Sequence, residues 1–245
     1  MLESVQGNPS PAISKIRDAI FNVTFDPWEK EGKVIVNVSY VNSDDVERVL
    51  EIYRLVDRLN ISISPYIKIL DETADNNKVG IMTICSITID GILLKHGISI
   101  NPVGGGVLYV EAARGVRFTD FLKYESTTID PLETLTGMGL TSVTDVIKTG
   151  SGKILANIRE APMIVKSDVE RLLEKIAHSG LNGVLEVGEP NRDLFDIPME
   201  RDHFGIVIAG GINPLVAAAE TGIQVENHAI SGIVEISEME RISDV

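Results

Sequence analysis

Three arginines, Arg114, Arg117 and Arg159, are the side chains of this sequence that are best suited to hold a small anion. A guanidinium group binds a planar carboxylate through two parallel N–H donors, which a lysine cannot do. Glu160 follows Arg159 directly, so an internal salt bridge is an equally good explanation of that arginine. The arginines predict a place that holds a carboxylate, and they do not by themselves predict a reaction.

Glycines and hydroxyls lie close to the first two arginines. Glycine lets the backbone approach a ligand closely, and a threonine hydroxyl can donate a hydrogen bond to it. The glycine spacing is not G-x-G-x-x-G, and a strand is predicted to follow, so neither a dinucleotide fingerprint nor a P-loop is indicated. A β-bulge or a tight strand entry is the alternative for at least two of the glycines. The candidate ligand contacts here are Gly104, Gly105, Gly106, Thr127 and Thr128.

A second glycine-rich turn lies in the other half of the chain. Gly210 and Gly211 end an apolar run, Asn213 is the expected N-cap of a helix, and Pro214 its first residue. The free backbone amides at such a helix start can bind an anion. An ordinary capped helix without a ligand is the alternative.

No residues with the spacing of catalytic or metal-binding groups stand out. The four histidines are separated, and none has metal-ligand spacing with another or with the single cysteine, Cys85. Cys85 lies in an apolar run, which predicts a reduced, buried thiol and excludes an internal disulfide. Asp130 precedes a proline and is explained by a turn. We therefore expect no catalytic residue, no metal and no cofactor.

Composition sets further limits. A hydrophobic content of 44% over 245 residues is typical of a globular protein with one large or two ordinary domains. The formal net charge of −14 argues against a direct grip on nucleic acid, which needs clustered Lys and Arg. The sequence shows no signal peptide and no apolar run long enough to span a bilayer, so a cytoplasmic protein is expected.

The residue patterns predict the elements that must position these groups. Residues 1–31 are expected to be a lead-in with a short helix at 13–20. Strands are predicted at 34–40, 66–70, 79–89 and 107–111, with a turn at Asp90-Gly91 after the third. Helices are predicted at 46–56 and, as a short one, at 118–122, followed by an extended segment at 127–135.

The second half repeats this pattern. Residues 152–158 match 32–38, residues 168–171 match 45–48, and residues 205–207 are matched to 106–108. Two copies, 32–145 and 146–245, are therefore predicted. Each fits a βαββαβ ferredoxin-like unit of the α/β (α+β) class. A Rossmann-like doubly wound sheet is the rival, and the absence of a predicted helix between 79–89 and 107–111 weakens it.

Several motifs also carry a family resemblance. They are CSITIDGILLKHGI at 85–98, the triple glycine, Arg117-Phe118, IDPLE at 129–133, GKILANIREAP at 152–162 and GGINP at 210–214. Their number and order resemble the regulatory domain of the archaeal nitrogen repressors of the NrpR type, from about Gly32 onward. The resemblance implies a homodimeric domain that binds 2-oxoglutarate as effector and thereby releases operator DNA, which a separate winged-helix segment holds.

No winged-helix pattern is visible in this chain, so DNA contact is expected only through a segment that this chain lacks. Two other functions remain open. One is an enzyme, a lyase or transferase that acts on a dicarboxylate through the same arginines. The other is an assembly module without a ligand.

Overall fold

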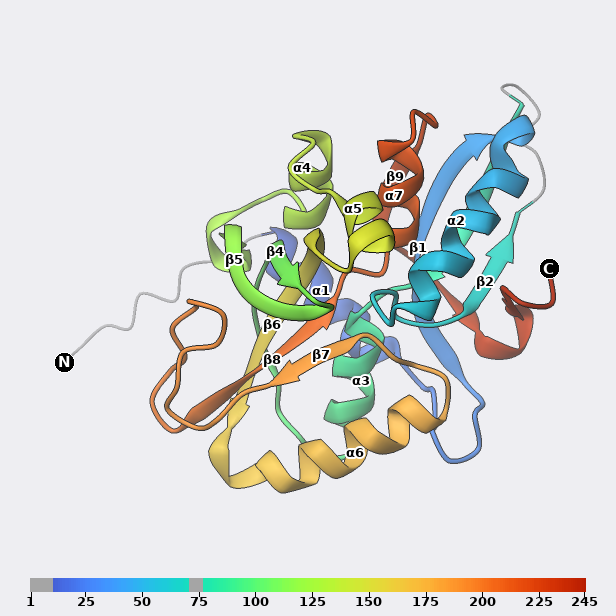
Figure 1. The fold of residues 1–245 in the computed structure, drawn as a ribbon. Helices are drawn as coiled ribbons and strands as arrows, with labels where there is room; N and C mark the ends of the chain where they lie inside the picture. Colours follow the sequence, from blue (N-terminus) through green and yellow to red (C-terminus); the bar gives the residue numbers. More distant parts are fainter. Residues whose placement is uncertain (1–10, 71–76) are drawn as a thin grey trace.

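The computed structural model describes residues 11–70 and 77–245 (Figure 1). Its elements up to residue 149 are α1 (Pro11–Asn22), β1 (Lys33–Asn42), η1 (Ser43–Asp45), α2 (Val46–Arg58), β2 (Tyr66–Ile69), β3 (Lys78–Ile84), α3 (Ile87–Lys95), β4 (Asn101–Glu111), β5 (Arg114–Lys123), η2 (Tyr124–Ser126), α4 (Pro131–Gly137) and α5 (Val143–Thr149). The elements after it are β6 (Gly152–Pro162), η3 (Met163–Val165), α6 (Lys166–His178), β7 (Val184–Val187), β8 (His203–Ala209), α7 (Asn213–Glu220), β9 (Glu226–Glu235), η4 (Ile236–Glu238) and β10 (Glu240–Arg241).

The predicted fold class is confirmed. The order β1-α2-β2-β3-α3-β4 returns as β6-α6-β7-β8-α7-β9. The matching elements also agree in length, since α2 and α6 each have 13 residues, β2 and β7 have 4, and β3 and β8 have 7. Each series is a βαββαβ unit, and every strand pair in the described residues is antiparallel.

The two units exchange their last strands. The strand order in one sheet is β10-β2-β3-β1-β9, and in the other it is β5-β4-β6-β8-β7. Strand β9 of the second unit therefore pairs with β1 of the first, and β4 of the first pairs with β6 of the second. Both sheets need residues from both halves of the chain. The division at residue 145 stays a prediction about sequence repeats.

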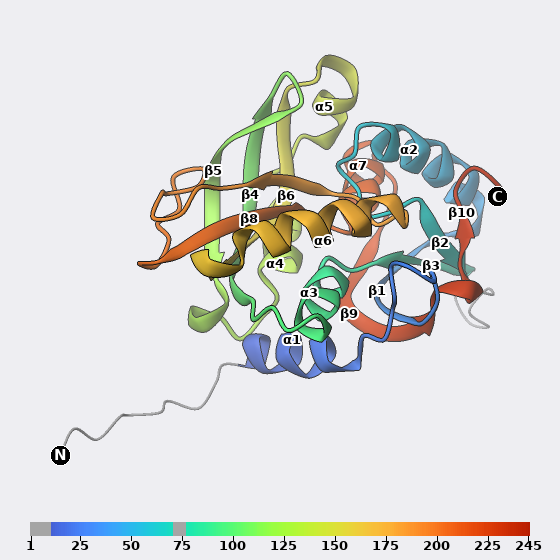
Figure 2. The same ribbon diagram turned by 90° about the horizontal axis from the view of Figure 1, so that it is seen from below.

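The helices follow the same exchange. Helices α2 and α7 pack together and share a core with β1, β2 and β3. Helices α3 and α6 share a core with β8, while α4 and α5 pack on the opposite face of that sheet, against β4 and β6. In the view from below, α6, α3 and α1 lie next to one another (Figure 2).

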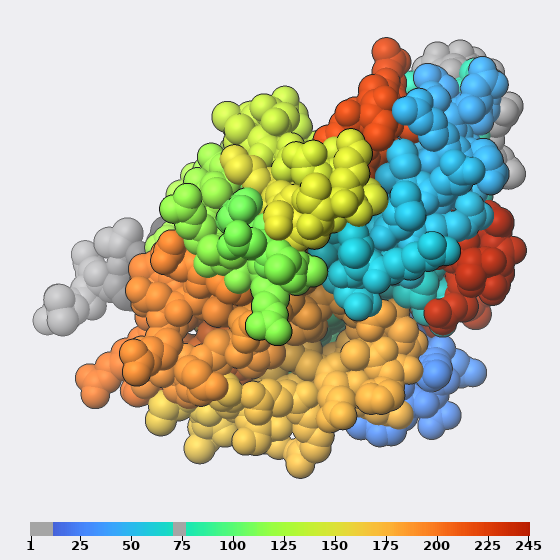
Figure 3. Space-filling model, viewed as in Figure 1, coloured from blue at the N-terminus to red at the C-terminus, as the bar shows by residue number. Residues whose placement is uncertain are grey.

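The described part of the predicted lead-in contributes to the core. Helix α1 packs against α3, and its Ile13, Ile16 and Ile20 are buried. The segment between α1 and β1 then lies beside the end of α6, as the adjacent blue and gold surfaces show (Figure 3). Residues 1–10 of the lead-in lie outside the described residues.

The predicted strand at 79–89 was wrong in its second half. Strand β3 ends at Ile84 and α3 begins at Ile87, with Asp90 and Gly91 inside the helix and not in a turn. Helix α3 is buried on nearly all sides, so its sequence lacks the polar face that is typical of a surface helix. Its β-branched residues also favour the prediction of a strand. A helix thus does separate β3 from β4, and it is the antiparallel pairing that excludes a doubly wound parallel sheet.

Three further predictions were wrong. Residues 118–122 belong to strand β5 and not to a helix, and the segment at 127–135 contains α4 instead of being extended throughout. Asp130 is the N-cap of α4, where its side chain accepts hydrogen bonds from the amides of Leu132 and Glu133. Residues 205–207 lie in β8, which corresponds to β3, so their match to 106–108 in β4 does not hold. The predicted helices and strands at 13–20, 34–40, 46–56 and 66–70 are confirmed.

Candidate functional site

Two buried asparagines mark the place where the two units meet. Val36 pairs with Ile84 in the first unit, and Ala156 pairs with Ala209 in the second, so the residues that follow, Asn37 and Asn157, are equivalent. Both are almost fully buried. A buried amide requires hydrogen-bond partners, which makes this pair of positions a candidate for a specific polar site.

Two helices begin at this place. The N-cap of α3 is Ser86 and that of α7 is Ile212, directly after Gly211. The helix dipole is positive at both helix starts, which favours an anion there. The Thr88 and Ile89 amides of α3 and the Asn213 and Leu215 amides of α7 already donate to backbone carbonyls. These residues enclose what we call the junction cavity. Its lining residues are Ile16, Asn37, Cys85, Ser86, Ile87, Tyr124, Asp130, Leu132, Asn157, Gly211, Ile212, Ala229 and Ile230.

A hydrogen-bond network fixes one side of the cavity. The Asn157 side chain donates to Ser86 Oγ over 3.1 Å and accepts from the Tyr124 hydroxyl over 2.7 Å. On the other side, Asn37 accepts from the amide of Ile230 over 3.2 Å, but its Nδ2 lies 3.5 Å from Thr83 Oγ1. That last bond is at the limit of hydrogen-bond length, so the Asn37 amide can be redirected to a ligand at little cost.

A buried ion pair lies behind Asn157. Arg159 Nε donates to Asp90 Oδ1 over 2.6 Å, and both side chains are at most 2% exposed. Arg159 Nη1 also approaches the Asn157 carbonyl at 3.4 Å. In the described part of the chain, no partner reaches Asp90 Oδ2. The internal salt bridge that was the alternative for Arg159 does exist, with Asp90 and not with Glu160 as its partner.

Burial controls the protonation of the surrounding groups. It raises the pKa of Asp90, which the Arg159 charge opposes, and the same attraction raises the pKa of Arg159 although burial acts against it. Burial raises the pKa of Cys85 to about 12 and the pKa of Tyr124 above its usual range. It also raises the pKa of Asp130. At neutral pH the cavity therefore presents a neutral thiol and a neutral phenol beside the two helix starts.

The cavity is closed in this structure. Its volume is about 20 Å³, enough for one water molecule and too small for a dicarboxylate. A larger ligand could enter only if the starts of α3 and α7 moved apart. No group of three or more His, Cys, Asp or Glu side chains within residues 11–70 and 77–245 could hold a metal ion.

Some of the sequence-predicted site residues come together here. Gly211 lines the cavity, and a Cβ on it would lie 2.4 Å from the carbonyl oxygen of Ile84. A Cβ on Gly105 would lie 3.1 Å from Asn157 Oδ1. Arg159 lies behind the cavity wall, and Gly210 is packed against Leu155.

Asn213 does not act as an N-cap. It is buried, accepts a hydrogen bond from the Leu155 amide, and donates to the carbonyls of Ile61 and Leu155. It thus joins α7 to both β6 and the segment after α2.

Other predicted site residues lie elsewhere. Arg114 and Arg117 are exposed on the edge strand β5. Thr127 closes its own turn by hydrogen bonds with Ile129, and Thr128 is exposed. Gly104 and Gly106 lie inside β4, where a Cβ on either would come within 2.4 Å of a β5 carbonyl oxygen. Close strand packing therefore accounts for these two glycines.

Sequence reasoning missed the polar residues that form the network. One usable signal was the presence of Asn37 and Asn157 at the same position of two apolar strand patterns, where asparagine is disfavoured. Ser86 and Tyr124 gave no such signal, because only the tertiary structure brings them to Asn157.

Comparison with known proteins supports a regulatory role. The family model described as NrpR regulatory domains NRD1 and 2 matches residues 10–241. The Global nitrogen regulator NrpRI of Methanosarcina mazei is 37% identical over 94% of this chain and 73% of its own length. The Global nitrogen regulator NrpR of Methanocaldococcus jannaschii is 31% identical over 96% of this chain but only 40% of its own length.

A solved structure agrees with the sequence matches. The crystal structure of a nitrogen repressor-like protein from Methanococcus jannaschii superposes with a TM-score of 0.84 at 29% identity, covering 96% of this chain and all of that one. No helix in the described ranges is long and apolar enough to cross a membrane. The relatives are named as regulators and not as enzymes. The chain therefore belongs to the family of NrpR regulatory domains, the regulatory part of a nitrogen-responsive repressor.

Proposed function

We propose that this domain senses 2-oxoglutarate by binding it in the junction cavity. The observation that carries the proposal is the convergence of two helix starts, α3 and α7, on one polar cavity that both units build. A dicarboxylate needs favourable surroundings for two charged ends, and the positive ends of two helix dipoles lie at this cavity. Asn37, Ser86 and Tyr124 add side-chain groups.

The donors are numerous enough for a metabolite-level affinity. A hydrogen bond to a charged group contributes roughly 1.5–3 kcal/mol. Three or four such bonds would outweigh the repulsion from an acidic chain and give a dissociation constant on the order of micromolar, about 8 kcal/mol. Arg159 lies close enough to lower the energy of an anion in the cavity, although Asp90 compensates much of its charge.

The closed cavity gives the binding event a mechanical effect. Entry of a ligand must separate α3 from α7, and each of these helices leads into the strand that the two units exchange. Binding would therefore shift one sheet relative to the other. In the longer repressor, such a shift can reposition a DNA-binding segment, so that effector binding releases the operator.

We also propose that the domain forms a homodimer. Repressors that read palindromic operators match the two-fold symmetry of the site with their own. Sedimentation of this chain at micromolar concentration should give a dimer, and a monomer would contradict this part of the proposal.

Calorimetric titration with 2-oxoglutarate tests the placement of the site. We expect the parent to bind and Asn37→Leu and Ser86→Ala to bind at least about fivefold more weakly, since each loses a donor. Arg114→Ala and Arg117→Ala are the matched controls, because they remove exposed cations of β5 that do not line the cavity. If the two cavity variants bind like the parent while an exposed-arginine variant does not, the effector site lies at β5.

A further inference from the structure

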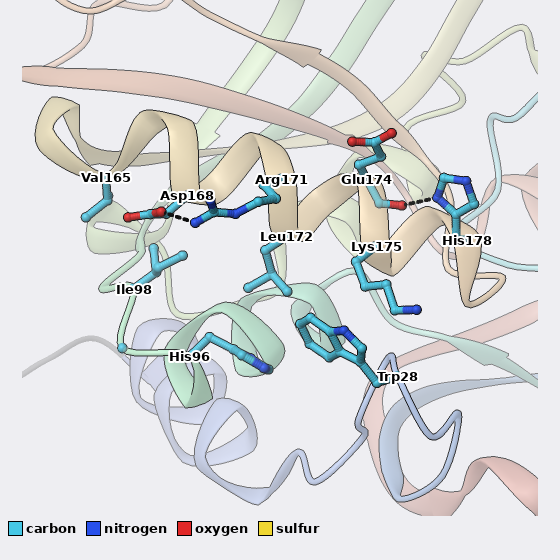
Figure 4. Close-up of a pocket in the computed structure, with 11 residues that line it drawn as sticks. Trp28, His96, Ile98, Val165, Asp168, Arg171, Leu172, Glu174, Lys175 and His178 are labelled. Atoms are coloured by element: carbon cyan, nitrogen blue, oxygen red, sulfur yellow. Dashed lines mark hydrogen bonds and ion pairs between the residues drawn. The ribbon is translucent and has the colours of Figure 1, made fainter.

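A second, larger cavity lies at the other end of α3. It is a groove of about 650 Å³ between α6, the end of α3 and the segment before β1, and we call it the α6 groove (Figure 4). A cavity of this size accommodates a small organic ligand. Its floor contains Ile98, Val165 and Leu172. The remaining lining residues are Trp28, His96, Gly97, Asp168, Arg171, Glu174, Lys175 and His178.

Aromatic rings form one end of the groove. Trp28 is the single tryptophan of the chain, and 52% of it is exposed. Its ring lies 5.2 Å from the His96 ring at an interplanar angle of 33°. Exposed tryptophan beside an apolar floor is costly in water and is a common platform for a planar ring.

The charges that face the groove are favourable to an anion. Lys175 Nζ lies over the Trp28 ring, 5.7 Å from its centroid, in a cation–π contact. No carboxylate of the described residues lies within ion-pair distance of it. The Glu174 side chain points to the far side of α6, away from Trp28 (Figure 4). Asp168 is already paired with Arg171. In a chain with a formal charge of −14, a lysine whose described partner is an aromatic ring and not a carboxylate is a distinctive combination.

The two histidines of the groove have their Nδ1 atoms occupied. His96 Nδ1 lies 2.8 Å from the Ile92 carbonyl and His178 Nδ1 lies 2.7 Å from the Glu174 carbonyl. In both rings Nδ1 must therefore carry the hydrogen, which leaves Nε2 available to a ligand.

We propose that the α6 groove binds a nucleotide. The base would stack at the Trp28 end over the apolar floor, and the phosphate would be held by Lys175. A free base or nucleoside would use only the aromatic end, and inorganic phosphate only the lysine. A nucleotide carries both the ring and the phosphate that the groove would bind, and this distinguishes it from apolar compounds in general. The inference does not depend on 2-oxoglutarate binding in the junction cavity.

Trp28 supplies the assay, because its emission is the only tryptophan signal of the chain. Titration of the chain with AMP should change Trp28 emission in a saturable way, and adenosine should bind about tenfold more weakly because it lacks the charged contact. Inorganic phosphate alone should bind at least about tenfold more weakly than AMP, because it uses only the lysine. Lys175→Gln should weaken AMP binding about tenfold and leave adenosine binding as it was. Lys148→Gln, an exposed lysine on α5, is the control and should bind AMP like the parent.

Two results would overturn the inference. One is the absence of any saturable change with AMP, confirmed by calorimetry on the same sample. The other is equal loss of adenosine and AMP binding in Lys175→Gln, which would show that the lysine only supports the groove wall. Trp28→Phe, followed by calorimetry, separates a lost fluorophore from lost binding, and its affinity for AMP should fall.

Discussion

The ion pair between Asp90 and Arg159 offers a sharp quantitative prediction. Both side chains are at most 2% exposed, and Asp90 Oδ2 has no partner among the described residues. Replacing Arg159 by Met therefore leaves a buried carboxylate without any partner for either oxygen. Breaking a buried pair in this way costs about 3–5 kcal/mol, a large share of the roughly 5–15 kcal/mol that stabilises a domain.

A double-mutant cycle isolates the pair. Arg159→Met and Asp90→Asn should each lower the free energy of unfolding by about 3–5 kcal/mol. The double variant should lose at least ~2 kcal/mol less than the sum, because it leaves no buried charge behind. Urea unfolding followed by circular dichroism gives these values. The reasoning is refuted if the two single effects add up within about 0.5 kcal/mol.

The exposed pair on α6 is the matched control for this cycle. Arg171 and Asp168 form an ion pair three residues apart, with side chains 79% and 58% exposed. Water and salt screen such a pair, so the cycle of Arg171→Met and Asp168→Asn should give a coupling below about 1 kcal/mol.

Three further predictions concern the packing and titration of the core. Gly91→Ala should destabilise the fold by roughly 1–3 kcal/mol, although alanine has the better helix propensity, because the new Cβ would lie 2.4 Å from Val23. Equal or higher stability in urea would show that α1 does not pack closely on α3. Asn213→Ala should cost about 2 kcal/mol or more, since the Leu155 amide and the Ile61 carbonyl lose their partner, while the Leu155 carbonyl keeps the Gly210 amide. A loss below about 0.5 kcal/mol would contradict this role. Burial raises the pKa of Asp130 above its ordinary value of 3.8, so the protonated carboxyl favours the folded state. This contribution to the free energy of unfolding is fully present below pH 3.8 and is lost as the pH rises through the folded-state pKa. Asp130→Asn keeps the N-cap acceptor, so its stability relative to the parent should rise with pH above about 4; a difference that stays constant with pH would refute this titration.

The sequence allowed the fold class to be predicted because the two copies repeat a periodic pattern. Amphipathic helices α2 and α6 and the strands before them could be located from spacing alone. Helix α3 could not, because it is buried on nearly all sides and its Ile-Thr-Ile run has strand propensity. The exchange of β4 and β9 depends on long-range pairing, which no local pattern encodes.

The candidate site was harder to predict for the same reason. Arg159 and Gly211 were predicted as site residues and lie behind and in the wall of the junction cavity. The partner of Arg159 lies on α3, in a segment expected to be a turn. The exposed arginines of β5 looked similar in the sequence, because composition does not reveal burial. Asn37 and Asn157 become meaningful only when the two units are placed face to face.

The most direct test of the central claim is a crystal structure of this chain grown with 2-oxoglutarate. We predict density for the ligand between the starts of α3 and α7, in contact with Asn37 and Ser86, and a junction cavity that has opened relative to its present volume of about 20 Å³. Ligand density beside Arg114 and Arg117 on β5, or in the α6 groove, together with a closed junction cavity would contradict the account.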